Sequence, residues 1–99
     1  MWLFGNNQNQ KLVSMSRRSR MEVIIDILTE SLDGANKTRI MYRANLNFLR
    51  FNCYLSEMLE NGLLKEENNG IGGVVVYKAT ESGKALLRTL HKAQQFMPI

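Results

Sequence analysis

The sequence is short of the residues that carry most enzymatic and metal chemistry. Its 99 residues include one cysteine and one histidine, so it can form neither an internal disulfide nor a cluster of such metal ligands. A catalytic site would need a nucleophile, a base and a polarising group near one another, and no such grouping is visible. The acidic pairs Glu57 with Glu60 and Glu66 with Glu67 are typical of solvated surface. We therefore predict no enzyme, no metal site and no cofactor.

Long apolar runs are also lacking. The run from Val74 to Tyr77 is among the longest, and it is far too short to cross a bilayer. The amino-terminal segment lacks the leading cations and the extended apolar stretch of a signal peptide. Together with the single cysteine, these absences predict a cytoplasmic protein that does not associate with membranes.

What the sequence does contain is charge sorted into blocks. Residues 21–33 carry four acids and no cation, whereas residues 34–55 carry four cations and no acid, within a net charge of +4. A surface with no polyanionic partner normally mixes its signs, so these blocks favour a polyanion as ligand over a chance arrangement. At 44% hydrophobic, the chain can bury one small core, and we expect one domain.

The first eighteen residues are rich in Asn and Gln and show no sustained period. This composition predicts a flexible basic tail over residues 1–18, and Met15 is an alternative start of the chain. Arg17, Arg18 and Arg20 stand just before the first patterned segment. They are candidates for contact with phosphate groups or a minor groove, and a solvated linker fits them equally well.

A first helix is predicted over about residues 20–32. Ser19 and Glu22 have the spacing of a capping box, and Gly34 follows as a stop. One stripe of this helix is apolar and should face the core; it contains Met21, Ile24, Ile25, Leu28 and Leu32. Val23 and Ile27 lie to one side and suit a second contact, with the last helix or with a partner subunit.

Two further helices joined by a tight turn follow. They are expected over about residues 38–44 and 47–61, with Asn47 as the N-cap of the second and Gly62 as its left-handed stop. A helix-turn-helix of this kind can present its second helix to the major groove of DNA.

The second of these helices has two distinct faces. Its predicted core face contains Phe48, Phe51, Leu55, Met58 and Leu59. The candidates for reading base edges on the other face are Asn47, Leu49, Arg50 and Cys53. Arg can pair with guanine and Asn with adenine, whereas Leu and Cys can contact a thymine methyl group. Ordinary soluble surface is the alternative for Asn47 and Arg50, and an incidental or oxidation-sensitive thiol is the alternative for Cys53.

Several residues around this helix are candidates for contacts with phosphate. Lys37, Thr38 and Arg39 lie at the amino end of the shorter helix, where free backbone N–H groups favour an anion. Tyr54 flanks the reading face, and Lys78 lies on a later strand. Simple solvation is the alternative for Lys37 and Arg39.

After Gly62 the apolar period changes from that of a helix to that of a strand. Two strands, over about residues 63–67 and 74–78, predict a hairpin whose tip includes Asn68 and Asn69. This hairpin would be a wing that enters a minor groove or only completes the sheet. A last helix over about residues 81–96, capped by Thr80, carries a narrow apolar seam made of Leu86, Leu90, Ala93 and Met97. Part of this seam is predicted to pair with a second copy.

Ordered motifs along the chain resemble a known family. They are RMEVIIDIL at 20–28, KTRIMY at 37–42, ANLNF at 44–48, YL at 54–55, LENGLL at 59–64 and YKATESG at 77–83. Over about residues 17–96 the chain resembles the archaeal ArnR-like winged helix-turn-helix domain, a group that includes the ten-a type chromatin proteins of Sulfolobales. The resemblance implies a winged helix, DNA as ligand and often a dimer joined through the carboxy-terminal helix. The last helix here is shorter than in the chromatin members, and the wing is longer.

These observations predict a mainly α winged helix-turn-helix with a small β-hairpin. The expected domain occupies residues 19–80, and residues 81–99 form the helix that joins two copies. The leading hypothesis is a transcriptional regulator that binds double-stranded DNA in the nucleoid, with the helix at about 47–60 in the major groove. The alternatives are an architectural chromatin protein with little sequence preference and a winged helix that binds another protein.

Overall fold

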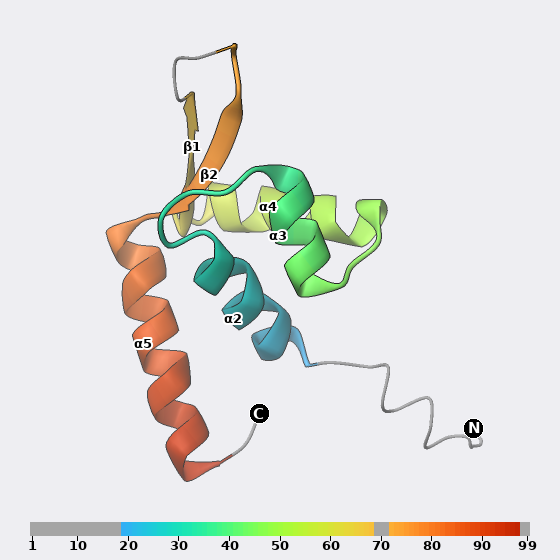
Figure 1. The fold of residues 1–99 in the computed structure, drawn as a ribbon. Coiled ribbons are helices and arrows are strands. Elements are labelled where there is room, and N and C mark those ends of the chain that lie inside the picture. Colours follow the sequence, from blue (N-terminus) through green and yellow to red (C-terminus); the bar gives the residue numbers. More distant parts are fainter. Residues whose placement is uncertain (1–18, 69–71, 98–99) are drawn as a thin grey trace, which may run out of the picture.

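The computed structural model describes residues 19–68 and 72–97 (Figure 1). The elements follow in the order α2 (Arg20–Glu30), α3 (Lys37–Ala44), α4 (Phe48–Glu60), β1 (Leu64–Asn68), β2 (Val75–Ala79) and α5 (Glu81–Phe96). The predicted elements are therefore all present, with bounds that differ by at most two residues. The predictions for the tail, for Met15, Arg17 and Arg18, and for Asn69 at the hairpin tip lie outside the described residues.

Helix α2 begins at the predicted capping box. The Ser19 hydroxyl accepts a hydrogen bond from the backbone N–H of Glu22, and the Glu22 carboxylate accepts one from the backbone N–H of Ser19. Its buried face differs from the predicted stripe, because it is centred on Val23, Ile24, Ile27 and Leu28. Three residues of the predicted stripe are only partly buried: Met21, Ile25 and Leu32. The face shifts because α2 packs against both α3 and α5.

The helix-turn-helix is built by three asparagines. Asn36 caps α3 through a hydrogen bond from the Arg39 backbone N–H, and Asn47 caps α4 in the same way through Arg50. Asn45, between the helices, has a left-handed backbone with φ of 56°. Asn tolerates this conformation better than most residues, so the chain can reverse over a short connection.

The hairpin is extended by a short third segment. β1 and β2 pair in antiparallel fashion with Leu64 opposite Ala79 and Glu66 opposite Tyr77. On the other side of β2, Ala35 exchanges two backbone hydrogen bonds with Tyr77. In Figure 1 the hairpin projects beyond the helices, while α5 runs from its base in the opposite direction, beside α2.

Helix α5 supports the domain with only part of its apolar seam. Thr80 caps it as predicted, and its buried residues are Gly83, Leu87 and Leu90. Leu86 is partly buried, whereas Ala93 and Met97 are exposed. The carboxy-terminal end of α5 therefore contributes little to this chain's own core.

The predicted burial was wrong for one residue of α4. Phe48 was expected in the core, but 60% of its surface is exposed. Figure 1 shows that α4 begins beyond the end of α3, at the side of the molecule farthest from α5, so its first turn extends past the helical core. Phe51, one turn further on, is fully buried.

Candidate nucleic-acid interface

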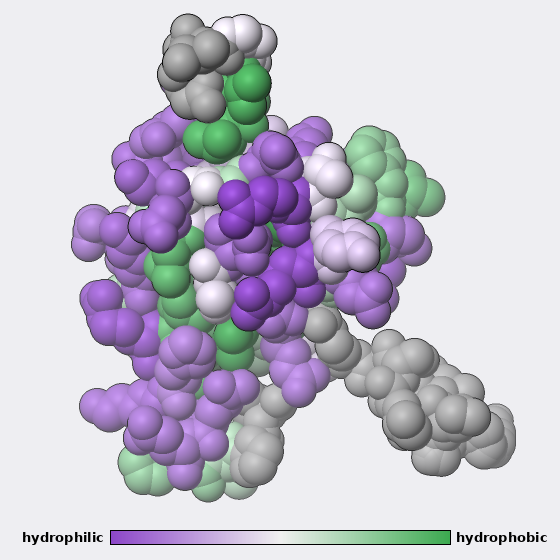
Figure 2. All heavy atoms as spheres, in the orientation of Figure 1, coloured by the Kyte–Doolittle hydropathy of each residue, from purple (hydrophilic) through white to green (hydrophobic). Residues whose placement is uncertain are grey.

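The first two turns of α4 present an exposed face that lacks acidic residues. Leu49 is 77% exposed, and Arg50 and Cys53 are also exposed, as the helical period predicted. Figure 2 shows a hydrophobic group of atoms over the beginning of α4, where Phe48 and Leu49 are the exposed large apolar residues. The acids Glu57 and Glu60 follow only in the later turns.

Asn47 lies at the start of this face, but its side chain already has a structural role. Its Oδ1 accepts the hydrogen bond from the Arg50 backbone N–H at 2.8 Å. A bidentate contact with adenine would use both Oδ1 and Nδ2 of an Asn side chain. As long as Asn47 caps α4, its Nδ2 group is the part that is available to a ligand.

Tyr54 does not flank the exposed face as expected, because it is only 8% exposed and belongs to the core. The Arg20 guanidinium lies over its ring, 5.5 Å from the ring centre. The same guanidinium donates a hydrogen bond to the Glu57 carboxylate at 2.5 Å, and this contact raises the pKa of Arg20. Arg20, a predicted phosphate contact, therefore bridges the start of α2 to the later turns of α4.

A second set of ion pairs joins α2 to α3. The Arg39 guanidinium contacts the Glu30 carboxylate at 2.6 Å, and Arg43 contacts Glu30 at 3.5 Å and Asp26 at 3.9 Å. We call these four residues the Glu30 ladder. These pairs were not predicted from the sequence, although acids and cations four residues apart on successive helices are a usable signal. Two of the four cations in residues 34–55 are thus paired with carboxylates.

The remaining candidates lie on the surface in different settings. Lys37 and Thr38 are exposed at the amino end of α3, and within residues 19–68 and 72–97 neither Lys37 nor Arg50 has an ion pair. Lys78 is half-buried on β2, directly opposite Lys65 on β1. Asn68 is exposed at the end of β1. Lys37 and Arg50 are therefore the cations of the block that are free to meet an anion.

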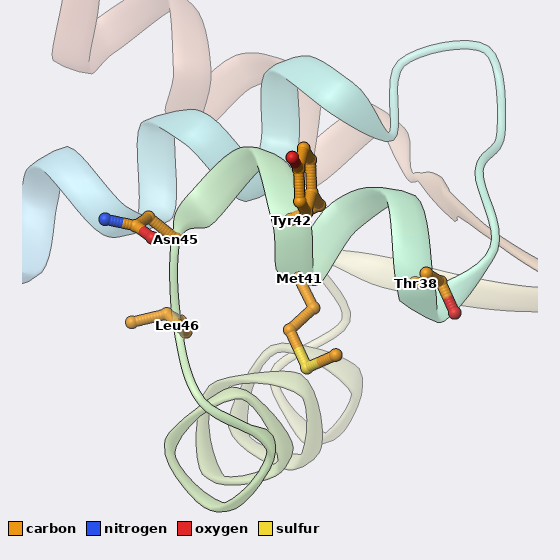
Figure 3. A pocket seen from close by; sticks show the side chains of 5 residues that line it. All are labelled: Thr38, Met41, Tyr42, Asn45 and Leu46. Carbon is orange, nitrogen blue, oxygen red and sulfur yellow. The ribbon is translucent and has the colours of Figure 1, made fainter.

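A shallow pocket of about 380 Å³ lies beside the helix-turn-helix connection. Its lining residues come from α3 and from the loop that follows: Thr38, Met41, Tyr42, Asn45 and Leu46. Figure 3 shows Met41 extending from α3 towards α4, while Tyr42 points away from α4. Tyr42 is 87% exposed, so the pocket opens widely to solvent next to the start of α4.

Metal-binding clusters and membrane-spanning helices are absent from the described part of the chain. No group of three or more His, Cys, Asp or Glu side chains is placed to hold a metal ion. No helix there has the length and apolar character to cross a membrane.

These features define a class of protein. The family model described as "Winged helix-turn-helix" matches residues 17–97, and the chain belongs to this family, as its ordered motifs predicted. The order of three helices, hairpin and last helix is that of the family.

The chain is also similar to individual proteins. The chain is 34% identical over 94 residues to the uncharacterized protein MJ0287 of Methanocaldococcus jannaschii, covering 94% of this chain and 89% of that protein. The structure is similar to that of Sso10a-2, a DNA-binding protein from Sulfolobus solfataricus, with a TM-score of 0.68 and 26% identity over 80% of this chain and 81% of that one. It also shares its fold with the PcaV transcriptional regulator from Streptomyces coelicolor, with a TM-score of 0.63 and 18% identity over 82% of this chain and 61% of that one.

Proposed function

We propose that this protein is a transcriptional regulator that binds double-stranded DNA with α4 in the major groove. The observation that carries the proposal is the exposed, acid-free face formed by the first two turns of α4, in the same helix-turn-helix as the exposed amino end of α3. Membership of the winged helix-turn-helix family supports it. So does the similarity to Sso10a-2, whose structure is described as that of a DNA-binding protein. Such a function places the protein in the cytoplasm, at the nucleoid, and needs neither catalysis nor a cofactor.

Phosphate contacts would fix the position of α4 on the duplex. Lys37 and the free backbone N–H groups at the start of α3 can contact one phosphate without breaking any ion pair. Arg20 and Arg39 would first have to leave Glu57 and Glu30. Lys78 and Asn68 would bring the hairpin to the same sugar-phosphate backbone of the DNA. Base contacts then come from Leu49, Arg50 and Cys53, with Nδ2 of Asn47 beside them.

Two matched variants separate base contacts from phosphate contacts. Arg50→Ala should relax the preference at one base pair, at a cost of about 1–3 kcal/mol for the preferred base. Lys37→Ala should weaken binding to all duplexes alike. It should also make the plot of log affinity against log salt concentration less steep by about 0.9, the contribution of one phosphate contact. Fluorescence anisotropy over a series of salt concentrations measures both. Equal losses on every duplex for both variants would rule out sequence reading by Arg50.

Selection from a pool of random duplexes separates this function from an architectural one. An enriched motif is expected for a regulator, and a flat outcome would indicate a protein that coats DNA. Binding that withstands high salt, or no binding to any duplex at low salt, would instead indicate a protein-interaction module.

We also propose that the carboxy-terminal end of α5 joins two copies of the chain. Phe96 is 83% exposed and Met97 is 68% exposed, beyond the last residue of α5 that the body covers. Large apolar side chains grouped at one end of a helix commonly mark a contact between proteins.

A further inference from the structure

The line of α4 that lies opposite its buried residues carries no charge over its first half. Leu49 and Cys53 lie one turn apart on this line, and Ser56 follows them. Arg50 lies one residue round the helix, on the side that also carries Glu57. The part of α4 that would reach deepest into a groove is therefore an apolar side chain, Leu49, rather than a cation.

Phe48 enlarges this apolar surface. It is 60% exposed and Leu49 is 77% exposed, and they occupy the first two positions of α4. Figure 2 shows a hydrophobic group of atoms over the beginning of α4, on the face seen in that view. We call Phe48 and Leu49 the apolar tip. Exposed aromatic and leucine side chains in adjacent positions are unusual on a surface that contacts only water.

The charges around the apolar tip suit DNA as its occupant. Residues 34–55 contain four cations and no acid, and the tip lies within this block. Lys37 and Arg50, which belong to the same helix-turn-helix, have no ion pair within the described residues. In the major groove, the apolar group that distinguishes one base pair from another is the 5-methyl group of thymine.

We propose that the apolar tip reads thymine methyl groups in the major groove, with Leu49 as the principal contact. This inference rests on the proposed binding of duplex DNA and names the chemical group that the α4 face selects. Arg50 then adds a polar contact beside the methyl contact, and Lys37 contacts a phosphate of the DNA backbone.

The test removes only the methyl groups from the ligand. Two duplexes of identical A·T-containing sequence are prepared, one with dT and one with dU in its place, and anisotropy titrations measure the affinity of the full chain for each. Wild-type protein should bind the dU duplex about three- to fivefold more weakly for each methyl group that loses its contact, since each buried methyl contributes on the order of a methylene's transfer free energy.

Variants of the chain assign that difference to the apolar tip. Leu49→Ala should bind the dT duplex more weakly and should lose most of the difference between dT and dU. Val74→Ala is the matched control, because Val74 is an exposed apolar residue at the start of the hairpin's second arm, 44% exposed, outside α4. It should retain the wild-type difference. Circular dichroism checks that each variant is folded, and the exposure of Leu49 favours an intact fold.

The outcomes distinguish the inference from the function on which it rests. If wild-type protein binds both duplexes with equal affinity, the methyl contact is wrong while DNA binding stands. If no duplex binds at low salt, both proposals are overturned. If Leu49→Ala leaves the dT to dU difference intact, or converts a dimer to a monomer in light scattering with no effect on that difference, the tip is not the methyl-reading surface.

Discussion

At Gly83, α5 approaches the segment before β1 very closely. A Cβ atom at this position would lie 2.2 Å from the backbone carbonyl oxygen of Leu63 and 3.1 Å from Cδ2 of Leu28. Since a backbone atom cannot move aside easily, any side chain here would push α5 away from the segment between α4 and β1 and from α2.

Gly83→Ala should therefore destabilise the fold even though alanine favours helices. We expect the free energy of unfolding to fall by about 1–3 kcal/mol, the usual cost of overpacking a close contact. Urea denaturation measures it. Ser82→Ala is the matched control, since Ser82 is exposed on the same turn and should change stability by less than about 0.5 kcal/mol. Equal stability of Gly83→Ala and wild type would show that the close approach is relieved without cost.

Tyr77 makes the stability of the fold depend on pH in the alkaline range. It is 7% exposed, and burial, together with the nearby Glu66 carboxylate, raises the pKa of its phenol. In the unfolded chain this phenol ionises near pH 10, whereas in the folded chain it keeps its proton to a higher pH. The unfolded state therefore loses the proton first, and stability falls as the pH rises above about 10 until the folded-state pKa is passed.

Tyr77→Phe should remove this part of the alkaline loss. Urea denaturation at a series of pH values from about 8 to about 11 compares the slopes of stability against pH for the two chains. Tyr42→Phe, at a position that is 87% exposed, is the control and should follow wild type. The assignment fails if Tyr77→Phe loses stability with pH as steeply as wild type does.

Between α2 and α3, the Glu30 ladder determines which cations of α3 can contact a ligand. Arg39 was predicted as a phosphate contact from its place at the amino end of the helix, and the structure pairs it with Glu30 at 2.6 Å. An internal carboxylate therefore competes with phosphate for the same guanidinium. The pairs are largely solvent-exposed on the arginine side, so each contributes little to stability.

Glu30→Gln should accordingly strengthen DNA binding while weakening the fold slightly. Loss of the carboxylate releases Arg39, and we expect affinity at low salt to rise by about two- to fivefold and stability to fall by less than about 1 kcal/mol. Anisotropy and urea denaturation give the two values. Asp33→Asn removes the same charge just beyond α2, where Asp33 is exposed and has no ion pair among the described residues. If both variants raise affinity equally, the gain comes from net charge and not from the ladder.

The two proposed interaction surfaces lie far apart on the fold. Figure 1 places the start of α4 and the carboxy-terminal end of α5 at opposite sides of the fold, and the hairpin projects away from both. A second copy on the end of α5 would thus leave the first turns of α4 uncovered. The arrangement allows one dimer to present two α4 helices to a duplex.

Phe96→Ser should weaken this dimer without unfolding the domain. Phe96 is 83% exposed, so its loss costs the monomer little, whereas the apolar area that a partner would cover disappears. Light scattering after size exclusion should show the mass falling from about two chains to one at micromolar protein. Gln95→Ala, at the neighbouring exposed position, should leave the mass unchanged. A wild-type chain that is monomeric at all concentrations would contradict the proposed dimer.

The element order and most helix boundaries were predictable from the sequence, because they depend on interactions within a few residues. Ser19, Asn47 and Thr80 each accept a hydrogen bond from the backbone N–H three residues later. Their residue types and positions in the sequence predict these caps. Family motifs gave the winged arrangement of these elements. Helical periodicity also identified the exposed side of α4, including Leu49 and Arg50, since a single helix fixes the angles between its own side chains.

Which side chains are available to a ligand depends on how the helices pack against one another. Phe48 is exposed because α4 begins beyond the core, Tyr54 is buried with Arg20 over its ring, and Arg39 is paired with Glu30. Each of these outcomes depends on an element elsewhere in the chain, and neither periodicity nor local spacing contains its position. Local hydrogen bonds and apolar periods thus determined the helices and strands, whereas the packing of distant segments determined the burial and the charge of the surface they form.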